Sequence, residues 1–271
     1  MLTVKIDGKT VQGDPGMTVL EAAQRAGIRI PTLCHHEGVK PYGSCRLCTV
    51  EIADGDRTTL QASCCYPIKE GLVVRTDAPA VVAGRKLLFQ IYLARCPEVQ
   101  AIRNLAEEWG VSDSPFESAN EDCVLCGLCV RACAEAMGAE AIAFSGRGTS
   151  RKVGTPFDFP SETCRACGAC TYVCPTGRMQ MEAETVARLR RRIAAERKCR
   201  YMLMGMASSK LCPNDYDCPH CSFDQTMELR FGTHPVLAIA STKGKVGAIP
   251  CTRGSLARAD TFGKMERTKN E

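Results

Sequence analysis

The chain has 271 residues, of which 19 are cysteine, and its formal net charge is +5. This length allows two or three small domains, and a mild positive charge does not by itself indicate a partner. The sequence shows no apolar run long enough for a membrane-spanning helix and no apolar stretch typical of a secretory signal, so we expect neither. Cysteines at two- and three-residue spacings suit metal sites better than disulfides, which predicts a reducing, cytoplasmic location.

Residues 1–78 are predicted to form a small mixed domain. Its strands, predicted from alternating residues and turn signals, are residues 2–6, 10–12, 46–52, 58–61 and 72–76. A helix begins at Thr18 with the pattern of a capping box and ends at Gly27. Hairpin, helix, cysteine loop, hairpin and strand follow one another in the order of a β-grasp fold, which makes the chain an α+β protein.

Three further segments follow this domain. They are a helical connector over residues 79–114, a cysteine-dense segment over 115–181 and a cysteine-rich C-terminal extension over 182–271. Apolar residues recur at helical spacing over 80–94, and a second helix is expected over 99–109. The extension begins with an arginine-rich helix over 184–198. From Gly232 on we expect a loosely ordered tail or an arm that packs on a partner.

The first cysteine set predicts a 2Fe–2S site. It reads Cys34-x10-Cys45-x2-Cys48-x15-Cys64. A 2Fe–2S cluster needs four thiolates, and we expect the closely spaced Cys45 and Cys48 to chelate one side of it. Spacing alone leaves the fourth ligand open between the last cysteine and its neighbour Cys65. Because four cysteines suffice, His35 and His36 are interpreted as histidines of a surface loop.

The second set is the strongest signal in the chain. It reads Cys123-x2-Cys126-x2-Cys129-x3-Cys133 and then Cys164-x2-Cys167-x2-Cys170-x3-Cys174-Pro175. This is the bacterial ferredoxin run, present twice, in which the fourth cysteine of each run binds the other cluster. One 4Fe–4S cluster is therefore assigned to Cys123, Cys126, Cys129 and Cys174, and the other to Cys133, Cys164, Cys167 and Cys170. Gly127 and Gly168 hold matching positions, where a small residue lets the loop wrap a cluster.

A third set lies in the C-terminal extension. It reads Cys199-x12-Cys212-x5-Cys218-x2-Cys221. Four cysteines within 23 residues predict a metal site that holds zinc or a further 4Fe–4S cluster, and reduced structural cysteines are the alternative. We favour a cluster because the rest of the chain is iron–sulfur chemistry. Cys96 and Cys251 are isolated and are interpreted as structural or free thiols.

Residues 1–180 resemble the iron–sulfur subunit of NAD-reducing hydrogenases, the N-terminal part of the large iron–sulfur subunit of complex I, and iron-only hydrogenases. The motifs are Pro31-Thr32-Leu33-Cys34-His35-His36, Gly43-Ser44-Cys45-Arg46-Leu47-Cys48 and the double ferredoxin run. The resemblance places the fourth 2Fe–2S ligand at Cys64, three residues before Pro67, and leaves Cys65 as a small buried hydrophobic residue. The family usually carries a further 4Fe–4S site with one histidine and three cysteines. Residues 94–100 hold one cysteine and no histidine, so we expect that site to be missing.

These patterns predict a non-catalytic electron-transfer subunit. The sequence contains no nucleotide-binding fingerprint, so two-electron chemistry is assigned to partners. The resemblance implies a flavin- and NAD(P)H-binding subunit and a further catalytic subunit, within a cytoplasmic NAD(P)H-linked multisubunit oxidoreductase. The alternative is a non-NAD partner of the heterodisulfide reductase-like or formate dehydrogenase-like kind. A third class, a metal-bound nucleic-acid or regulatory protein, is suggested only by the basic residues over 188–200. Aromatic residues for base stacking are missing there, so we expect no nucleic acid.

Overall fold

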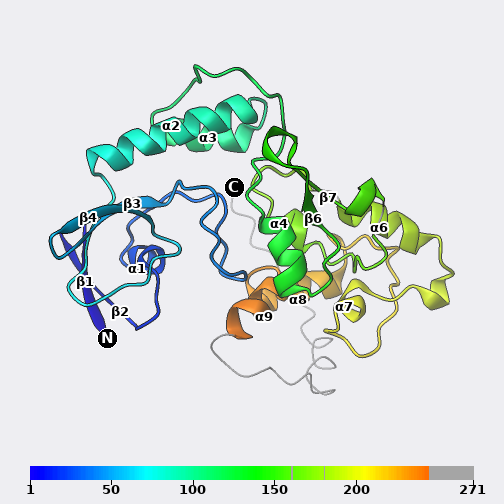
Figure 1. Ribbon diagram of the computed structural model, residues 1–271. Coiled ribbons are helices and arrows are strands. Elements are labelled where there is room, and N and C mark those ends of the chain that lie inside the picture. The colour runs from blue at the N-terminus through cyan, green and yellow to red at the C-terminus, as the bar shows by residue number, and fades with distance from the viewer. Residues whose placement is uncertain (160, 180, 244–271) are drawn as a thin grey trace, which may run out of the picture. The chain divides into compact units, whose positions relative to one another are not determined.

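The computed structural model describes residues 1–159, 161–179 and 181–243, and the chain divides into two compact units (Figure 1). The first unit consists of residues 1–36, 40–128 and 175–178, and the second of residues 37–39, 129–174 and those from 179 onward. The segment boundaries expected near residues 78, 114 and 181 stay predictions.

Five strands form one mixed sheet in the first unit. They are β1 (Leu2–Ile6), β2 (Lys9–Gly13), β3 (Thr49–Asp54), β4 (Arg57–Ala62) and β5 (Val73–Arg75). Their order is β2-β1-β5-β3-β4, with β1 parallel to β5 and the other neighbours antiparallel. The predicted β-grasp arrangement and the α+β class are confirmed.

The core of this domain lies between the sheet and helix α1 (Val19–Arg25). Thr18 caps the helix as predicted, because its hydroxyl accepts from the Glu21 backbone N–H while the Glu21 carboxylate accepts from the Thr18 N–H. Two of the predicted iron–sulfur ligands, Cys48 and Cys64, belong to the same buried cluster as the apolar strand residues. The hydrophobic core of the domain therefore extends directly to the cysteine loop.

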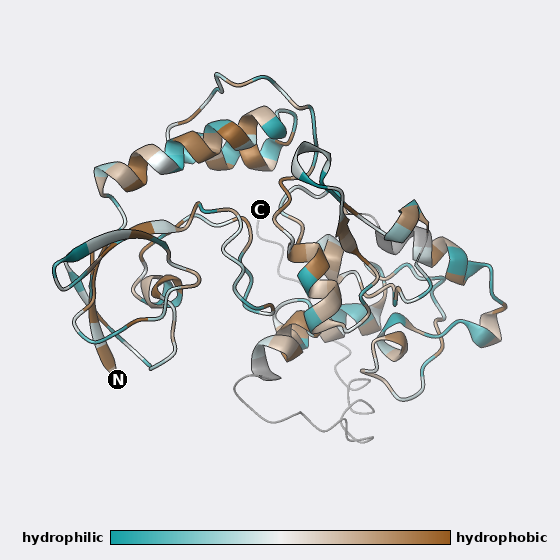
Figure 2. Ribbon diagram, in the orientation of Figure 1, coloured by the Kyte–Doolittle hydropathy of each residue, from teal (hydrophilic) through white to brown (hydrophobic). Residues whose placement is uncertain are grey.

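Two helices follow the sheet as expected. They are α2 (Pro79–Arg95) and α3 (Gln100–Glu108). Figure 2 shows apolar residues recurring along α2. One charged side chain of this helix is buried, since Arg85 is only 4 % exposed. Such burial of an arginine requires hydrogen-bond partners, and these are in the cysteine loop described below.

The dicluster region and the extension are built from short elements. They are α4 (Leu128–Arg131), a π-helical turn (Ala132–Ala136), β6 (Ala143–Ser145), β7 (Lys152–Gly154), α5 (Ala169–Tyr172), α6 (Met181–Arg190), α7 (Arg200–Leu203), α8 (Ser222–Phe231) and α9 (Pro235–Lys243), with single 3-10 turns over Gly148–Ser150, Pro156–Asp158 and Ala194–Glu196. Strands β6 and β7 pair as an antiparallel ribbon. None of the described helices combines the length and the apolar character that a bilayer span needs.

The arginine-rich helix is shorter than predicted. Helix α6 ends at Arg190 and does not continue to residue 198. Its end is fixed by Arg197, which donates to the backbone carbonyls of Arg190 and Arg192 and forms an ion pair with Asp215 at 2.7 Å. A cationic side chain on the last carbonyls of a helix stabilises its C-terminus, so the chain turns there.

The prediction of a loosely ordered tail or an arm after Gly232 is wrong for the described residues. Gly232 ends α8 in the left-handed conformation with a φ of 65°, and α9 begins three residues later. Val236 and Leu237 of α9 are buried, and a Cβ added at Gly38 would lie 2.7 Å from the Leu237 carbonyl oxygen. The prediction for residues 244–271 concerns a segment outside the described residues.

Candidate iron–sulfur sites

The four cysteines of the first set are all buried and form two close pairs. The Cys45 backbone N–H donates to Cys34 Sγ at 3.4 Å, and Cys48 Sγ lies 3.4 Å from Cys64 Sγ. The expectation that Cys45 and Cys48 chelate one side of the cluster stays a prediction. The β3–β4 register sets Thr49 opposite Ala62, and the next residue, Ser63, donates its N–H and its hydroxyl to the Cys48 carbonyl. Cys64, which follows Ser63, is thereby held next to Cys48.

Hydrogen bonds within these pairs change the pKa values of the thiols. The hydrogen bond with Cys34, together with burial, raises the pKa of Cys45 above its usual range. In the second pair the Cys64 hydrogen bond lowers the pKa of Cys48 to about 6, and the same bond raises the pKa of Cys64. Clusters bind thiolates, so filling this site releases protons.

Cys65 differs from Cys64 in its exposure. Cys64 is 1 % exposed, whereas Cys65 is exposed, so the expectation that Cys65 is a buried hydrophobic residue is wrong. Its sulfur lies against the turn at Gly43, where φ is 66° and an added Cβ would lie 3.1 Å from Cys65 Sγ. The burial of Cys64 supports its assignment as the fourth ligand, which stays a prediction.

Two side chains of α2 hold the cysteine loop in place. Arg85 donates to the Leu47 carbonyl at 3.1 Å and to the Thr49 carbonyl at 3.0 Å, and Tyr92 donates to the Cys45 carbonyl at 3.1 Å. Burial lowers the pKa of Arg85. Sequence reasoning missed both residues. The sequence did contain one signal for Arg85, because it lies three residues before Leu88 and so on the apolar face of the predicted helix over residues 80–94.

The two ferredoxin runs have the same local backbone. Leu125 and Ala166, just before the second cysteine of each run, have positive φ values of 53° and 49°. Gly127 and Gly168, just after it, have φ values of 72° and 76°. A short helix then begins at the next residue in both runs. The sequence repeat therefore corresponds to a repeat of the cysteine turn, and the left-handed glycine explains the two matching glycines.

The four cysteines assigned to one of the 4Fe–4S clusters come together in the second unit. Cys133, Cys164, Cys167 and Cys170 all line one cavity of about 20 Å³. The Ala141 backbone N–H donates to Cys133 Sγ at 3.2 Å, and burial raises the pKa of Cys170 above its usual range. Four thiols that line one cavity, with an N–H donor to sulfur, supply the ligand type and number of a 4Fe–4S cluster.

The other predicted set divides between the two compact units. Cys123 and Cys126 lie in the first unit, and Cys129 and Cys174 in the second, so their assignment to one cluster stays a prediction. Within the first unit the Leu125 backbone N–H donates to Cys123 Sγ at 3.4 Å. Arg178 forms an ion pair with Asp122 at 2.9 Å; burial opposes its charge, but a hydrogen bond to Cys123 and the charge of Asp122 raise its pKa.

The remaining cysteines differ in their surroundings. The third set comes together, because Cys199, Cys212, Cys218 and Cys221 line a second cavity of about 20 Å³. Cys96 is buried at the end of α2, where burial raises its pKa to about 11, as fits a structural thiol. Cys251 lies outside the described residues.

A buried four-cysteine loop on a β-grasp domain, followed by a duplicated ferredoxin turn, defines an iron–sulfur electron-transfer protein. Two protein families match these regions. The 2Fe-2S iron-sulfur cluster binding domain matches residues 1–79, and the 4Fe-4S dicluster domain matches residues 122–178. The chain thus carries a domain for one 2Fe–2S cluster and a domain for two 4Fe–4S clusters.

Curated proteins are similar in sequence to more than half of this chain. An NADH-quinone oxidoreductase subunit of Rhizobium meliloti is 32 % identical over 65 % of this chain and 24 % of its own length. The mitochondrial NADH-ubiquinone oxidoreductase 78 kDa subunit of Neurospora crassa is 29 % identical over 55 % of this chain and 24 % of its own length. The matched region is thus about a quarter of each of these curated relatives.

A solved structure corresponds to this chain over a larger share of its own length. A chain in the crystal structure of NAD+-reducing [NiFe]-hydrogenase in the H2-reduced state is 34 % identical, with a TM-score of 0.50, over 57 % of this chain and 74 % of that one. The chain belongs to this family of iron–sulfur subunits, which is homologous to the N-terminal part of the large iron–sulfur subunit of NADH-quinone oxidoreductases.

Proposed function

We propose that the chain is the iron–sulfur electron-transfer subunit of a cytoplasmic, NAD(P)H-linked multisubunit oxidoreductase. In this role it passes single electrons between a partner flavin and another redox site. The observation that carries the proposal is the similarity of both cluster-binding regions to proteins named for NADH or NAD+. The two- and three-residue spacings of the cysteines favour metal sites over disulfides, which supports a reducing compartment.

The residues of the chain hold and tune redox groups and perform no bond chemistry. Each bound cluster supplies one-electron exchange. Burial of Cys34, Cys45, Cys48 and Cys64 limits the access of water to their sulfurs, and backbone N–H groups donate to cysteine sulfur at Cys34 and Cys133. Such donors favour the more negative, reduced state and so raise the potential.

Two-electron chemistry is assigned to partner subunits. The sequence has no glycine-rich dinucleotide fingerprint after a strand and no Walker sequence. A flavin- and NAD(P)H-binding subunit would split the hydride pair into single electrons, and a further catalytic subunit would use them. The chain supplies the conducting segment of this arrangement.

Nucleotide-dependent reduction of the intact complex tests the proposal. The complex is purified anaerobically and mixed with NADH or NADPH, while visible absorbance and EPR report the clusters. We expect bleaching and the appearance of reduced-cluster signals within the dead time of manual mixing for at least one nucleotide. Clusters that stay oxidised with both nucleotides, yet are reduced by dithionite, would favour the partner without NAD.

The basic residues near α6 give little support to a nucleic-acid role. Arg188 donates to the Ser161 carbonyl, and Arg190 and Arg197 both form ion pairs with Asp215. Arg200 is buried. Much of the positive charge is thus used inside the chain, which favours a structural role for it.

A further inference from the structure

The third cysteine set resembles the ferredoxin site in its surroundings. Its members, Cys199, Cys212, Cys218 and Cys221, lie beyond residue 178, where the dicluster family match ends. All four line one cavity of about 20 Å³, the same size as the cavity of the Cys133, Cys164, Cys167 and Cys170 set. The α7 helix (Arg200–Leu203) and the start of α8 (Ser222–Phe231) fix the first and last of these thiols.

A single zinc ion and a 4Fe–4S cluster require different arrangements of four thiols. Zinc draws four sulfurs to about 2.3 Å from one point. In the described part of the chain no group of three or more His, Cys, Asp or Glu side chains is arranged to hold a metal ion. The same holds for the cysteines within residues 122–178, which the 4Fe-4S dicluster family matches. Four thiols around a cavity, in place of a point, are the common feature.

Backbone donors to sulfur form a second similarity. The Tyr216 N–H donates to Cys212 Sγ at 3.2 Å, and the Tyr201 N–H hydrogen-bonds to Cys199. The corresponding contact in the ferredoxin site is the Ala141 N–H to Cys133 Sγ, also at 3.2 Å. Such donors are a common feature of iron–sulfur sites, because the sulfur of a bound cluster carries negative charge.

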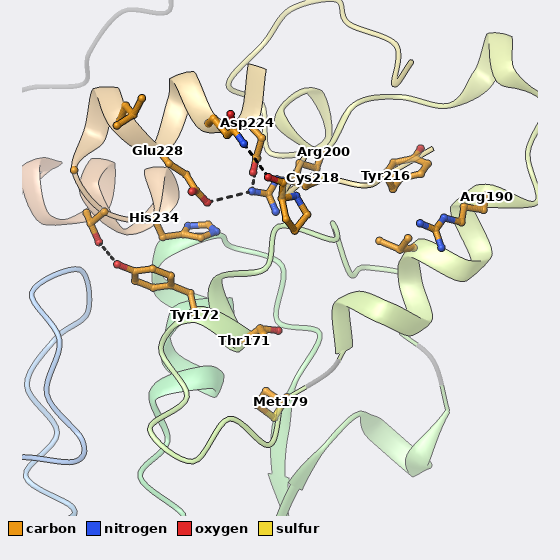
Figure 3. A pocket seen from close by; sticks show the side chains of 16 residues that line it. Thr171, Tyr172, Met179, Arg190, Arg200, Tyr216, Cys218, Asp224, Glu228 and His234 are labelled. Carbon is orange, nitrogen blue, oxygen red and sulfur yellow. Dashed lines mark hydrogen bonds and ion pairs between the residues drawn. The ribbon is translucent and has the colours of Figure 1, made fainter. Parts of the chain in front are cut away.

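We propose that Cys199, Cys212, Cys218 and Cys221 hold a third 4Fe–4S cluster. A cubane with four thiolates is an anion, and the lining of the site includes cationic as well as acidic side chains. The buried Arg200 lies beside Cys218 and forms ion pairs with Asp224 and Glu228 (Figure 3). Lys210 also lines the cavity. Arg200 therefore stabilises the anion, while Asp224 holds its guanidinium in place.

The third site shares its core with the neighbouring ferredoxin site. Met137 and Cys167 line the ferredoxin cavity and pack against the buried cluster that contains Cys199. Ala166 lines the same cavity and packs with Tyr216, which lines the third site. An electron that leaves one site can therefore reach the other through continuous packed protein, with one site oxidised and the other reduced by one electron.

The third site also borders an open cavity. Arg200, Tyr216, Cys218 and Asp224 line both the small thiol cavity and a neighbouring cavity of about 1140 Å³, which Figure 3 shows. The third site therefore packs against the ferredoxin site and also borders an accessible cavity. This placement suits the point where electrons enter or leave the second unit.

Metal analysis of the full-length chain tests the inference. The wild type, a Cys218→Ala variant and a Cys212→Ala/Cys218→Ala variant are purified anaerobically, with Cys251→Ala as the control outside every set. We expect both variants to lose about four iron and four sulfide per chain, and one reduced-cluster EPR signal, while the 2Fe–2S signal and the control stay unchanged.

Two results would overturn the inference. One is a loss of one zinc per chain in place of iron, and the other is unchanged iron, sulfide and zinc in both variants. If a variant does not fold, the iron and sulfide content of the wild type tests the inference instead. A content that one 2Fe–2S and two 4Fe–4S clusters fully account for would also overturn the third cluster. These counts need no nucleotide, so they are independent of whether NADH or NADPH reduces the complex.

Discussion

Cys64 and Cys65 are neighbours with different environments, and their variants should differ accordingly. Cys64 lies in the core and its sulfur is 3.4 Å from Cys48 Sγ, whereas Cys65 is exposed. We expect Cys64→Ala to lose about two iron per chain and the 2Fe–2S signal in visible circular dichroism, because one thiolate of four is removed. Cys65→Ala serves as the matched control and should retain both. Equal loss in the two variants, or loss only in Cys65→Ala, would reverse the ligand assignment.

Arg85 should be a stabilising residue of the cysteine loop. Its guanidinium donates to the carbonyls of Leu47, Thr49 and Thr76, all of which lose a donor in Arg85→Met. Unpaired buried acceptors cost about 1–3 kcal/mol each, and partial access to water reduces the sum, so we expect a loss of about 2–4 kcal/mol. The midpoint of anaerobic guanidinium unfolding, followed by 2Fe–2S circular dichroism, measures it.

The neighbouring Lys86 provides the control for this experiment. Lys86 is exposed on the same helix, so Lys86→Met removes a charge of the same sign without removing a buried hydrogen bond. Its unfolding midpoint should stay close to that of the wild type. If Arg85→Met unfolds at the same guanidinium concentration as Lys86→Met, the three contacts do not stabilise the loop.

At the residue scale, spacing grouped cysteines that the structure places together but did not predict the contacts within each group. Thiolates of iron–sulfur sites must come from short loops, so Cys133 and the Cys164 run could be grouped from sequence and now line one cavity. The contact between the sulfurs of Cys48 and Cys64 depends on strand register. The role of Arg85 depends on which backbone carbonyls of the cysteine loop lie next to α2. Both are contacts between segments distant in sequence, which local patterns do not specify.

At the scale of elements, α9 should contribute to the stability of the second unit. Leu237 is 0 % exposed, and truncation of a buried leucine to alanine costs about 2–5 kcal/mol. We expect Leu237→Ala to lower the guanidinium midpoint of the 4Fe–4S absorbance loss. Leu229→Ala on α8 is the matched control, because that leucine is 85 % exposed. An unchanged midpoint in Leu237→Ala would mean that α9 does not pack as described.

The sequence missed α9 for a physical reason. Residues 235–243 read PVLAIASTK, which is apolar or small on nearly all sides and shows no helical alternation. A helix without a polar face lacks the periodic pattern by which helices are predicted, so only its packing partners reveal it. Here Leu237 packs closely on Gly38, which is distant in the sequence. In contrast, α1 was predicted closely because its capping box is local.

At the scale of the whole chain, the two compact units are stabilised by different means. The β-grasp domain has a sheet, a helix and a large buried cluster. The dicluster region and the extension have strands of three residues and several helices of four. Such short elements bury little apolar surface by themselves, so binding of metal must supply more of the folding free energy there.

Removal of the clusters should therefore affect the chain unevenly. Anaerobic treatment with a strong iron chelator, followed by hydrogen–deuterium exchange and mass spectrometry, measures protection along the chain. We expect protection of residues 122–178 to collapse, because their loops lose the metal that holds them, while strands β1 and β3 keep most of theirs. If the third set also holds a cluster, the segment from Cys199 to Cys221 should lose protection with the ferredoxin loops. Retained protection over 122–178 after complete iron removal would show that the polypeptide alone maintains this fold.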